Sequence, residues 1–225
     1  MIKAVFFDLD GTLHNRKTSI VPFIENQYER LFVYFSHIPK EEYVSRFIEL
    51  DHDGYVWKDK VYGQMIIEYN IIGITCEELL KDYLTEFKYH CLAFENHLEM
   101  LSQLKKQGLL LGIITNGYGQ FQLDTIRALN IEEYLDVIII SEWEGFKKPD
   151  PEIFERALKK LGVNATESVF VGDHPKNDIE AAKNIGMITI WKRDLTIKMV
   201  QADYIIDNLL EIPRILQVME KEKYS

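Results

Sequence analysis

The stretch Ile2–Thr12, IKAVFFDLDGT, decides the fold of this chain. Its first six residues are mostly apolar and rich in β-formers, and Asp8, Asp10 and Gly11 follow them directly. A short apolar run that ends in turn-forming residues predicts a strand over residues 2–7, buried on both faces as strands of parallel sheets are. Ligands bind such sheets at the carboxyl ends of the strands, so the two aspartates are the first candidates for chemistry.

Five further apolar runs predict the rest of the sheet. They cover residues 109–115, 136–141, 168–173, 187–191 and 203–206. Three helices are predicted between them, over residues 95–107, 151–161 and 177–185, and each ends directly before a glycine. This alternation of strands and helices predicts an α/β fold with a doubly wound, Rossmann-like parallel sheet.

About 100 residues separate the first two predicted strands, far more than one crossover helix requires. Helical periodicity recurs in this segment over residues 20–35, 40–50, 59–72 and 76–89. We therefore expect an inserted α-helical cap domain over residues 17–92 and a catalytic core over residues 1–16 and 93–225. The cap holds 14 of the chain's 27 aromatic residues. Most should pack the cap's own core, and a few could line a pocket.

Composition excludes several classes of partner. The chain has 26 Lys and Arg against 36 Asp and Glu, a net charge of −10, which disfavours nucleic acid. Its apolar runs are too short to span a bilayer, and the N-terminal run is too short for a signal peptide. Two cysteines cannot form a disulfide framework. We expect a cytoplasmic protein without a membrane or nucleic-acid partner, and the sequence predicts nothing about protein partners.

Polar side chains gather where the predicted strands end. They are Asp8 and Asp10 after the first strand, Thr115 and Asn116 after the second, Lys148 before the helix that follows the third, and Asp173 and Asp178 after the fourth. Because the carboxyl ends of parallel strands meet at one edge, these groups should converge there. Several carboxylates with a hydroxyl, an amide and an ammonium suit Mg²⁺ together with a phosphate.

Four short sequences at these strand ends resemble the motifs of the haloacid dehalogenase superfamily. They are Asp8-Leu9-Asp10-Gly11-Thr12, Thr115-Asn116, Lys148-Pro149 and Gly172-Asp173-His174-Pro175-Lys176-Asn177-Asp178. All four are present and in order, and the cap between the first two is similar to that of subclass I phosphatases, such as phosphoglycolate phosphatases and nucleotidases. The resemblance covers the core and implies a Mg²⁺-dependent phosphomonoester hydrolase that works through an aspartyl-phosphate.

The resemblance also implies a role for each acid at the first and fourth motifs. Asp8 would be the nucleophile, and Asp10 the general acid and base. The Asp8 side chain, the Asp10 backbone carbonyl and the Asp173 carboxylate would hold the Mg²⁺. Asp178 would steer Lys148 or a metal-bound water, although the spacing leaves open whether Asn177 shares this task.

Three neutral or cationic groups would bind the phosphate. The Thr115 hydroxyl and the Asn116 backbone amide would bind its oxygens, and Lys148 would stabilise the charge that develops during transfer.

Other polar residues are interpreted as structural. His14 has no metal-ligand spacing to other histidines. The acidic cluster of Asp51, Asp53 and Asp59 is interpreted as a solvated cap loop.

Two other activities are compatible with these residues. A phosphomutase would use the same Asp8 but return the phosphoryl group to a sugar hydroxyl. A phosphoacceptor signalling module also uses a strand-end aspartate, but its acceptor does not precede a long insertion. A dehalogenase is disfavoured, because the dehalogenase branch of the superfamily lacks the second acid of the first motif, whereas Asp10 is present here.

The substrate remains open between several classes of small phosphate ester. The aromatic cap favours a nucleoside monophosphate whose base stacks on these rings, while phosphoglycolate and sugar phosphates fit the same kind of cap.

Overall fold

The computed structural model describes residues 1–197 and 200–222. The chain forms two compact units. The core unit combines Met1–Asn15 with the chain from Ala93 onward, and the helical unit is Arg16–Leu92. None of the helices in the described ranges is long and apolar enough to cross a membrane.

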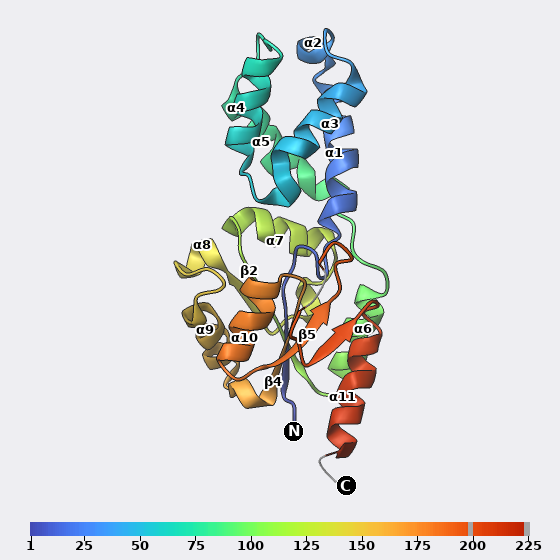
Figure 1. Ribbon diagram of the computed structural model, residues 1–225, viewed down its shortest axis with the longest axis vertical. Coiled ribbons are helices and arrows are strands. Elements are labelled where there is room, and N and C mark those ends of the chain that lie inside the picture. Colours follow the sequence, from blue (N-terminus) through green and yellow to red (C-terminus); the bar gives the residue numbers. More distant parts are fainter. Residues whose placement is uncertain (198–199, 223–225) are drawn as a thin grey trace. The chain divides into compact units, whose positions relative to one another are not determined.

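The core unit is built on a six-stranded sheet in which all neighbouring strands are parallel (Figure 1). The strands are β1 (Ala4–Phe7), β2 (Leu110–Thr115), β3 (Val137–Ile140), β4 (Ser168–Gly172), β5 (Ile188–Lys192) and β6 (Tyr204–Ile206), in the spatial order β3-β2-β1-β4-β5-β6. The chain moves outward from β1 to β3 and then returns to the other side of β1 at β4. This reversal makes the carboxyl ends of β1 and β4 the switch point where such sheets bind ligands. The predicted parallel α/β core is confirmed.

The central strand β1 is fully buried because every one of its residues is apolar. Ala4 pairs with Leu110 on one side and with Ser168 on the other. The β2 strand can lie close to the side chains of its neighbours β1 and β3 because residue 112 is a glycine. A Cβ at Gly112 would lie 2.7 Å from the side chains of both Phe6 and Val137.

Helices of the core unit cover both faces of the sheet. They are α6 (His97–Lys106), α7 (Gly119–Ala128), α8 (Ser141–Glu144), α9 (Pro151–Leu161), α10 (Ala181–Asn184) and α11 (Glu211–Glu222). Figure 1 shows α9 and α10 on one face, and α6 and α11 on the other. The predicted bounds of α9 are confirmed. Asp150 caps this helix by accepting a hydrogen bond from the Glu152 backbone N–H at 3.0 Å.

The predicted helix over residues 177–185 is wrong in form. The chain instead makes a π-helical turn over Pro175–Glu180 and continues as α10. The His174 carbonyl accepts from the N–H groups of both Asp178 and Ile179, the second of which is an i to i+5 bond. The π turn therefore determines where the Asp178 side chain points.

The helical unit contains five α-helices in its described residues. They are α1 (Arg16–Arg30), α2 (Phe32–Phe35), α3 (Lys40–Asp51), α4 (Lys58–Glu68) and α5 (Cys76–Glu86), with 3-10 turns at His52–Gly54 and Phe87–His90. The single helix predicted over residues 20–35 is interrupted at Leu31. α5 begins with a capping box, in which the Thr75 hydroxyl accepts from the Glu78 N–H and the Glu78 carboxylate from the Thr75 N–H.

Most aromatic residues of the helical unit pack against one another in its interior. Phe35 stacks on Tyr43 with ring centroids 4.5 Å apart, and Phe23 meets Tyr83 edge to face at 5.3 Å. All four are buried. The prediction that these aromatics form the unit's own core is confirmed.

One acid of the helical unit contradicts its sequence interpretation. Asp51 is buried, with only 2% of its surface exposed. It accepts two hydrogen bonds from the Arg16 guanidinium, at 2.8 and 2.9 Å, and pairs with the buried ammonium of Lys58. The solvated loop predicted for Asp51 is therefore wrong, because two cations, one of them 35 positions away, compensate its burial.

Candidate active site

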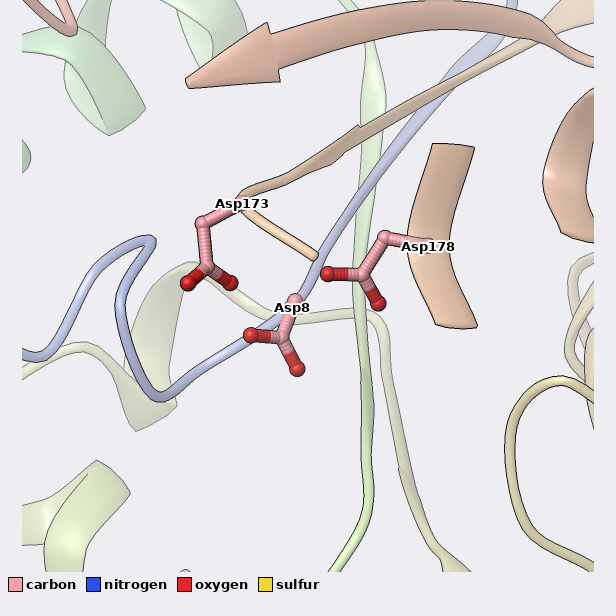
Figure 2. A group of neighbouring side chains, drawn as sticks. All are labelled: Asp8, Asp173 and Asp178. Atoms are coloured by element: carbon pink, nitrogen blue, oxygen red, sulfur yellow. The ribbon is translucent and has the colours of Figure 1, made fainter. Parts of the chain in front are cut away.

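Three carboxylates meet at the switch point of the sheet. Asp8 directly follows β1, Asp173 directly follows β4, and Asp178 lies in the π turn. One oxygen from each lies within 4.8 Å of the others, and Figure 2 shows the three side chains gathered together, from the segments after β1 and β4 and from the π turn. Asp8 and Asp178 are buried, whereas Asp173 is partly exposed. The structure thus brings together acids that are up to 170 positions apart.

Lys148 supplies a buried cation at this cluster. Its Nζ lies 2.5 Å from Oδ1 of Asp8 and 2.6 Å from Oδ1 of Asp178. The same ammonium sits over the Phe170 ring, 5.4 Å from its centroid. Because little of Lys148 is exposed, these ion pairs act in a medium of low dielectric constant.

The burial of the cluster shifts its titration. Burial raises the pKa of Asp8 well above its usual range, with a smaller opposing effect from Lys148. Burial and the charge of Asp178 raise the pKa of Asp173 to about 7. Burial lowers the pKa of Lys148, but Asp178 and Asp8 outweigh this effect and raise it, so the ammonium keeps its proton. One cation thus faces three crowded carboxyl groups.

This donor set fits a hard divalent cation. Carboxylate oxygens are the ligands that Mg²⁺ prefers, and it retains several water ligands. The partly exposed Asp173 leaves room for such waters, and a divalent charge would offset the repulsion among the carboxylates.

The loop that carries Lys148 is fixed by Asn116. The Asn116 side chain accepts a hydrogen bond from the Lys148 backbone N–H at 2.8 Å and donates one to the Lys148 carbonyl at 2.9 Å. Thr115, the last residue of β2 and the chain neighbour of Asn116, is buried. The predicted site residues after β2 are therefore joined to the Lys148 loop by two direct hydrogen bonds.

Asp10 lies outside the three-carboxylate group and has partners of its own. Its Oδ1 is 2.6 Å from Nδ1 of His14, and its Oδ2 accepts from Nε2 of Gln122 at 2.9 Å. Sequence reasoning missed both partners. The four-residue spacing from Asp10 was a signal for His14, whereas Gln122 lies on α7, a helix that the patterns did not predict.

Two glycines let the acids come this close. Gly11 has a φ of +88°, and a Cβ there would lie 2.2 Å from a carboxylate oxygen of Asp173. A Cβ at Gly172 would lie 2.4 Å from the Cβ of Asp178. Any larger residue at either position would displace an acid of the site.

The structure gives different partners to Asp178 and Asn177, the two residues of the fourth motif between which the spacing leaves the role open. The Asp178 carboxylate bonds to Lys148 and also accepts from the His174 N–H at 2.9 Å. The Asn177 backbone N–H donates to the His174 ring at 3.1 Å. Asp178 thus reaches the carboxylate cluster, and the Asn177 backbone helps to cap the π turn.

Comparison with known proteins gives consistent matches over nearly the whole chain. Residues 5–192 match the family model of haloacid dehalogenase-like hydrolases. A glyceraldehyde 3-phosphate phosphatase of Pyrococcus furiosus is 32% identical over 100% of this chain and 95% of its own length. Pyrophosphatase PpaX of Bacillus cereus is 29% identical, over 98% of this chain and 99% of its own.

Solved structures agree with these matches. The crystal structure of a HAD phosphatase from Thermococcus onnurineus aligns with a TM-score of 0.69 and 28% identity, covering 96% of this chain and 98% of that one. The putative HAD-hydrolase YfnB from Bacillus subtilis, bound to magnesium, has the same fold with a TM-score of 0.75 at 22% identity and the same coverage. With its parallel sheet, its strand-end acids and a family match across most of its length, this chain belongs to the haloacid dehalogenase-like hydrolases.

Proposed function

We propose that this protein is a Mg²⁺-dependent phosphomonoester hydrolase that acts on a small phosphorylated metabolite through an aspartyl-phosphate. One observation carries the proposal. Asp8 lies at the switch point beside a buried lysine and two further acids, the arrangement that a phosphoryl acceptor and a divalent cation need. Relatives named as phosphatases support the same activity.

In the first step, the Asp8 carboxylate attacks phosphorus in line, and the bond to the leaving oxygen breaks. Lys148 lies against Asp8, so it favours the ionised nucleophile and offsets charge on the transferring group. The Thr115 hydroxyl and the Asn116 backbone N–H are the proposed donors to the phosphate oxygens. Asp10 donates its proton to the leaving oxygen.

In the second step, Asp10 takes a proton from water, which attacks the aspartyl-phosphate and releases inorganic phosphate and free Asp8. The Asp8 and Asp173 carboxylates, with the Asp10 backbone carbonyl, are the proposed metal ligands. Asp178 positions Lys148 by accepting a hydrogen bond from its ammonium group. When bound, the metal supplies positive charge that offsets the repulsion between the carboxylates and a phosphate dianion.

We assign substrate choice to the helical unit, the insertion that the sequence predicts as a cap over residues 17–92. Its aromatic rings are mostly buried against one another, which favours a compact substrate such as a triose phosphate. Relatives named glyceraldehyde 3-phosphate phosphatase point to the same size class. A nucleoside monophosphate is the second candidate, because Tyr55 and Tyr89 of this unit remain exposed.

A substrate panel tests this function. Purified protein with Mg²⁺ is given glyceraldehyde 3-phosphate, a nucleoside monophosphate, pyrophosphate and p-nitrophenyl phosphate, and inorganic phosphate is measured. We expect phosphate release from the aryl ester and the strongest turnover on a small sugar phosphate. Conversion of a sugar phosphate to an isomer without phosphate release would identify a phosphomutase instead. Absence of turnover on all four would contradict the proposal.

A further inference from the structure

Asp10 is held by two buried side chains that neither bind the three-carboxylate cluster nor belong to the motifs. His14 is fully buried and Gln122 is 3% exposed, whereas the Asp10 side chain is 32% exposed. A partly exposed aspartate at the edge of the site is thus anchored on its inner side by two buried side chains.

His14 is fixed by the turn that follows β1. Its carbonyl accepts from the Gly11 N–H at 2.9 Å, and its own N–H donates to the Leu9 carbonyl at 2.8 Å. These bonds fix the His14 backbone, and the complete burial of its side chain leaves the ring little room to move away from Asp10. Because an ionised carboxylate can only accept, Nδ1 of His14 must carry the hydrogen when Asp10 is charged.

Gln122 connects Asp10 to the loop after β2. Its Nε2 donates to Oδ2 of Asp10 at 2.9 Å and to the Asn116 carbonyl at 3.0 Å. Position 117 must be small for this approach, since a Cβ at Gly117 would lie 2.5 Å from the same nitrogen. One amide group thus ties the proposed acid to the proposed phosphate-binding loop.

We infer that His14 and Gln122 are positioning residues that hold the Asp10 carboxyl group in the orientation needed for proton transfer. The inference rests on the proposed function. A carboxylate offers about four acceptor directions, and these two bonds occupy one on each oxygen. With both oxygens held, the Asp10 side chain is still 32% exposed, and this exposed part is where we place the leaving oxygen and then the water.

A positioning role differs from a structural one in its dependence on the leaving group. An alkoxide needs a proton as it leaves, whereas nitrophenolate leaves without one. If Asp10 is misplaced, only transfer from the alkyl ester should suffer strongly. A variant that merely loosens the core unit would slow both substrates alike.

The test uses the full-length protein with Mg²⁺ in single-turnover kinetics, where phosphoryl transfer is observed apart from hydrolysis of the intermediate. The variants are His14→Phe and Gln122→Leu, which remove the donors, and His14→Asn, which keeps an amide donor near the position of Nδ1. Gln120→Leu is the matched control, because Gln120 is exposed on the same helix and bonds to Asp124.

We expect Gln122→Leu and His14→Phe to lower the transfer rate from an alkyl phosphate by about 10-fold to 100-fold. The rate from p-nitrophenyl phosphate should fall less than about threefold, and the half-saturating concentrations should stay within about twofold. His14→Asn should recover most of the alkyl rate, and Gln120→Leu should match wild type. Circular dichroism establishes which variants are folded. Because the two residues lie on different elements, loss of folding in one leaves the other to decide.

Equal losses on both substrates, or no loss on either, would overturn the inference. In that case wild-type turnover and an inactive Asp8→Asn variant would still support the phosphatase. If wild type releases no phosphate from either ester, the proposed function itself fails. The two failures are therefore distinguishable.

Discussion

The Nζ atom of Lys148 lies 2.5 Å from Oδ1 of Asp8, although 140 positions separate the two residues in the chain. The same ammonium also pairs with Asp178 at 2.6 Å. One buried cation thus compensates two buried carboxylates. This arrangement links catalysis and stability, because removing the cation affects both.

Replacement of Lys148 by methionine should lower turnover by about 100-fold to 1,000-fold, because the preorganised charge against the phosphoryl group is lost. The change should also lower the free energy of unfolding by about 3–5 kcal/mol, since Asp8 and Asp178 lose their buried partner. Kinetics and urea unfolding measure the two effects. Lys147→Met is the matched control, because Lys147 is the exposed neighbour.

A second substitution separates the two consequences. Adding Asp178→Asn to Lys148→Met removes one of the unpaired acids and should recover part of the lost stability. Turnover should remain low, since the cation is still absent. Recovery of activity in the double variant would show that Lys148 acts only through folding.

Asp8→Asn should abolish turnover while the protein stays folded. The amide is nearly isosteric but a poor nucleophile, and no aspartyl-phosphate can form. Phosphate release and the circular dichroism spectrum are measured together. Even a tenth of wild-type turnover in a folded variant would contradict the nucleophile assignment.

Mg²⁺ should stabilise the core unit and be required for activity. The carboxyl groups of Asp8, Asp173 and Asp178 lie too close together for one lysine to neutralise when all are ionised. At about 100 times its dissociation constant, Mg²⁺ should add about 2.7 kcal/mol of stability. Thermal melting with Mg²⁺ and with excess chelator measures this effect. Asp173→Asn should reduce the gain, and full activity in chelator would contradict the requirement.

The stability of the β5–β6 edge should depend on pH through Asp203. Its carboxylate accepts from the Thr189 backbone N–H at 2.9 Å and from the Thr189 hydroxyl at 2.7 Å. Burial raises the pKa of Asp203, but the hydrogen bonds from Thr189 and Lys183 outweigh burial and hold it below its ordinary value. A lowered pKa means that the stabilisation is present above the unfolded value, about 3.9, and is lost as the pH falls through the folded value.

Asp203→Asn measures this contribution. At pH 7 it should lower the free energy of unfolding by about 1 kcal/mol, a modest effect because the side chain is over a third exposed. The difference from wild type should shrink as urea unfolding is repeated towards pH 3. A difference that stays constant from pH 7 to pH 3 would contradict the assignment.

In the helical unit, Asp51→Asn should be strongly destabilising. The carboxylate compensates both Arg16 and the buried Lys58, and the amide leaves these two cations beside each other. The expected loss is about 3–5 kcal/mol in urea unfolding. Asp59→Asn, at an exposed position in the first turn of α4, should change stability little. Similar values for both variants would show that the buried triad contributes nothing special.

The sequence by itself determined the parallel sheet. The strand at Ala4–Phe7 could be predicted because a run that is apolar on both faces has to be buried on both faces. The position of Asp8 after this strand then located the site, since parallel strands share one carboxyl edge. α9 was predictable for a local reason too, as Asp150 and Pro151 start it and Gly162 ends it.

Only the tertiary structure decided which side chains meet. Gln122 reaches Asp10 across 112 positions, and Asp51 finds Arg16 across 35, and no local pattern encodes either pair. Likewise, the π turn at Pro175–Glu180, which brings Asp178 to Lys148 across 30 positions, was visible only in the structure. The physical reason is that periodicity reports which residues must leave water, whereas the partner of a buried polar group is chosen by how distant segments pack.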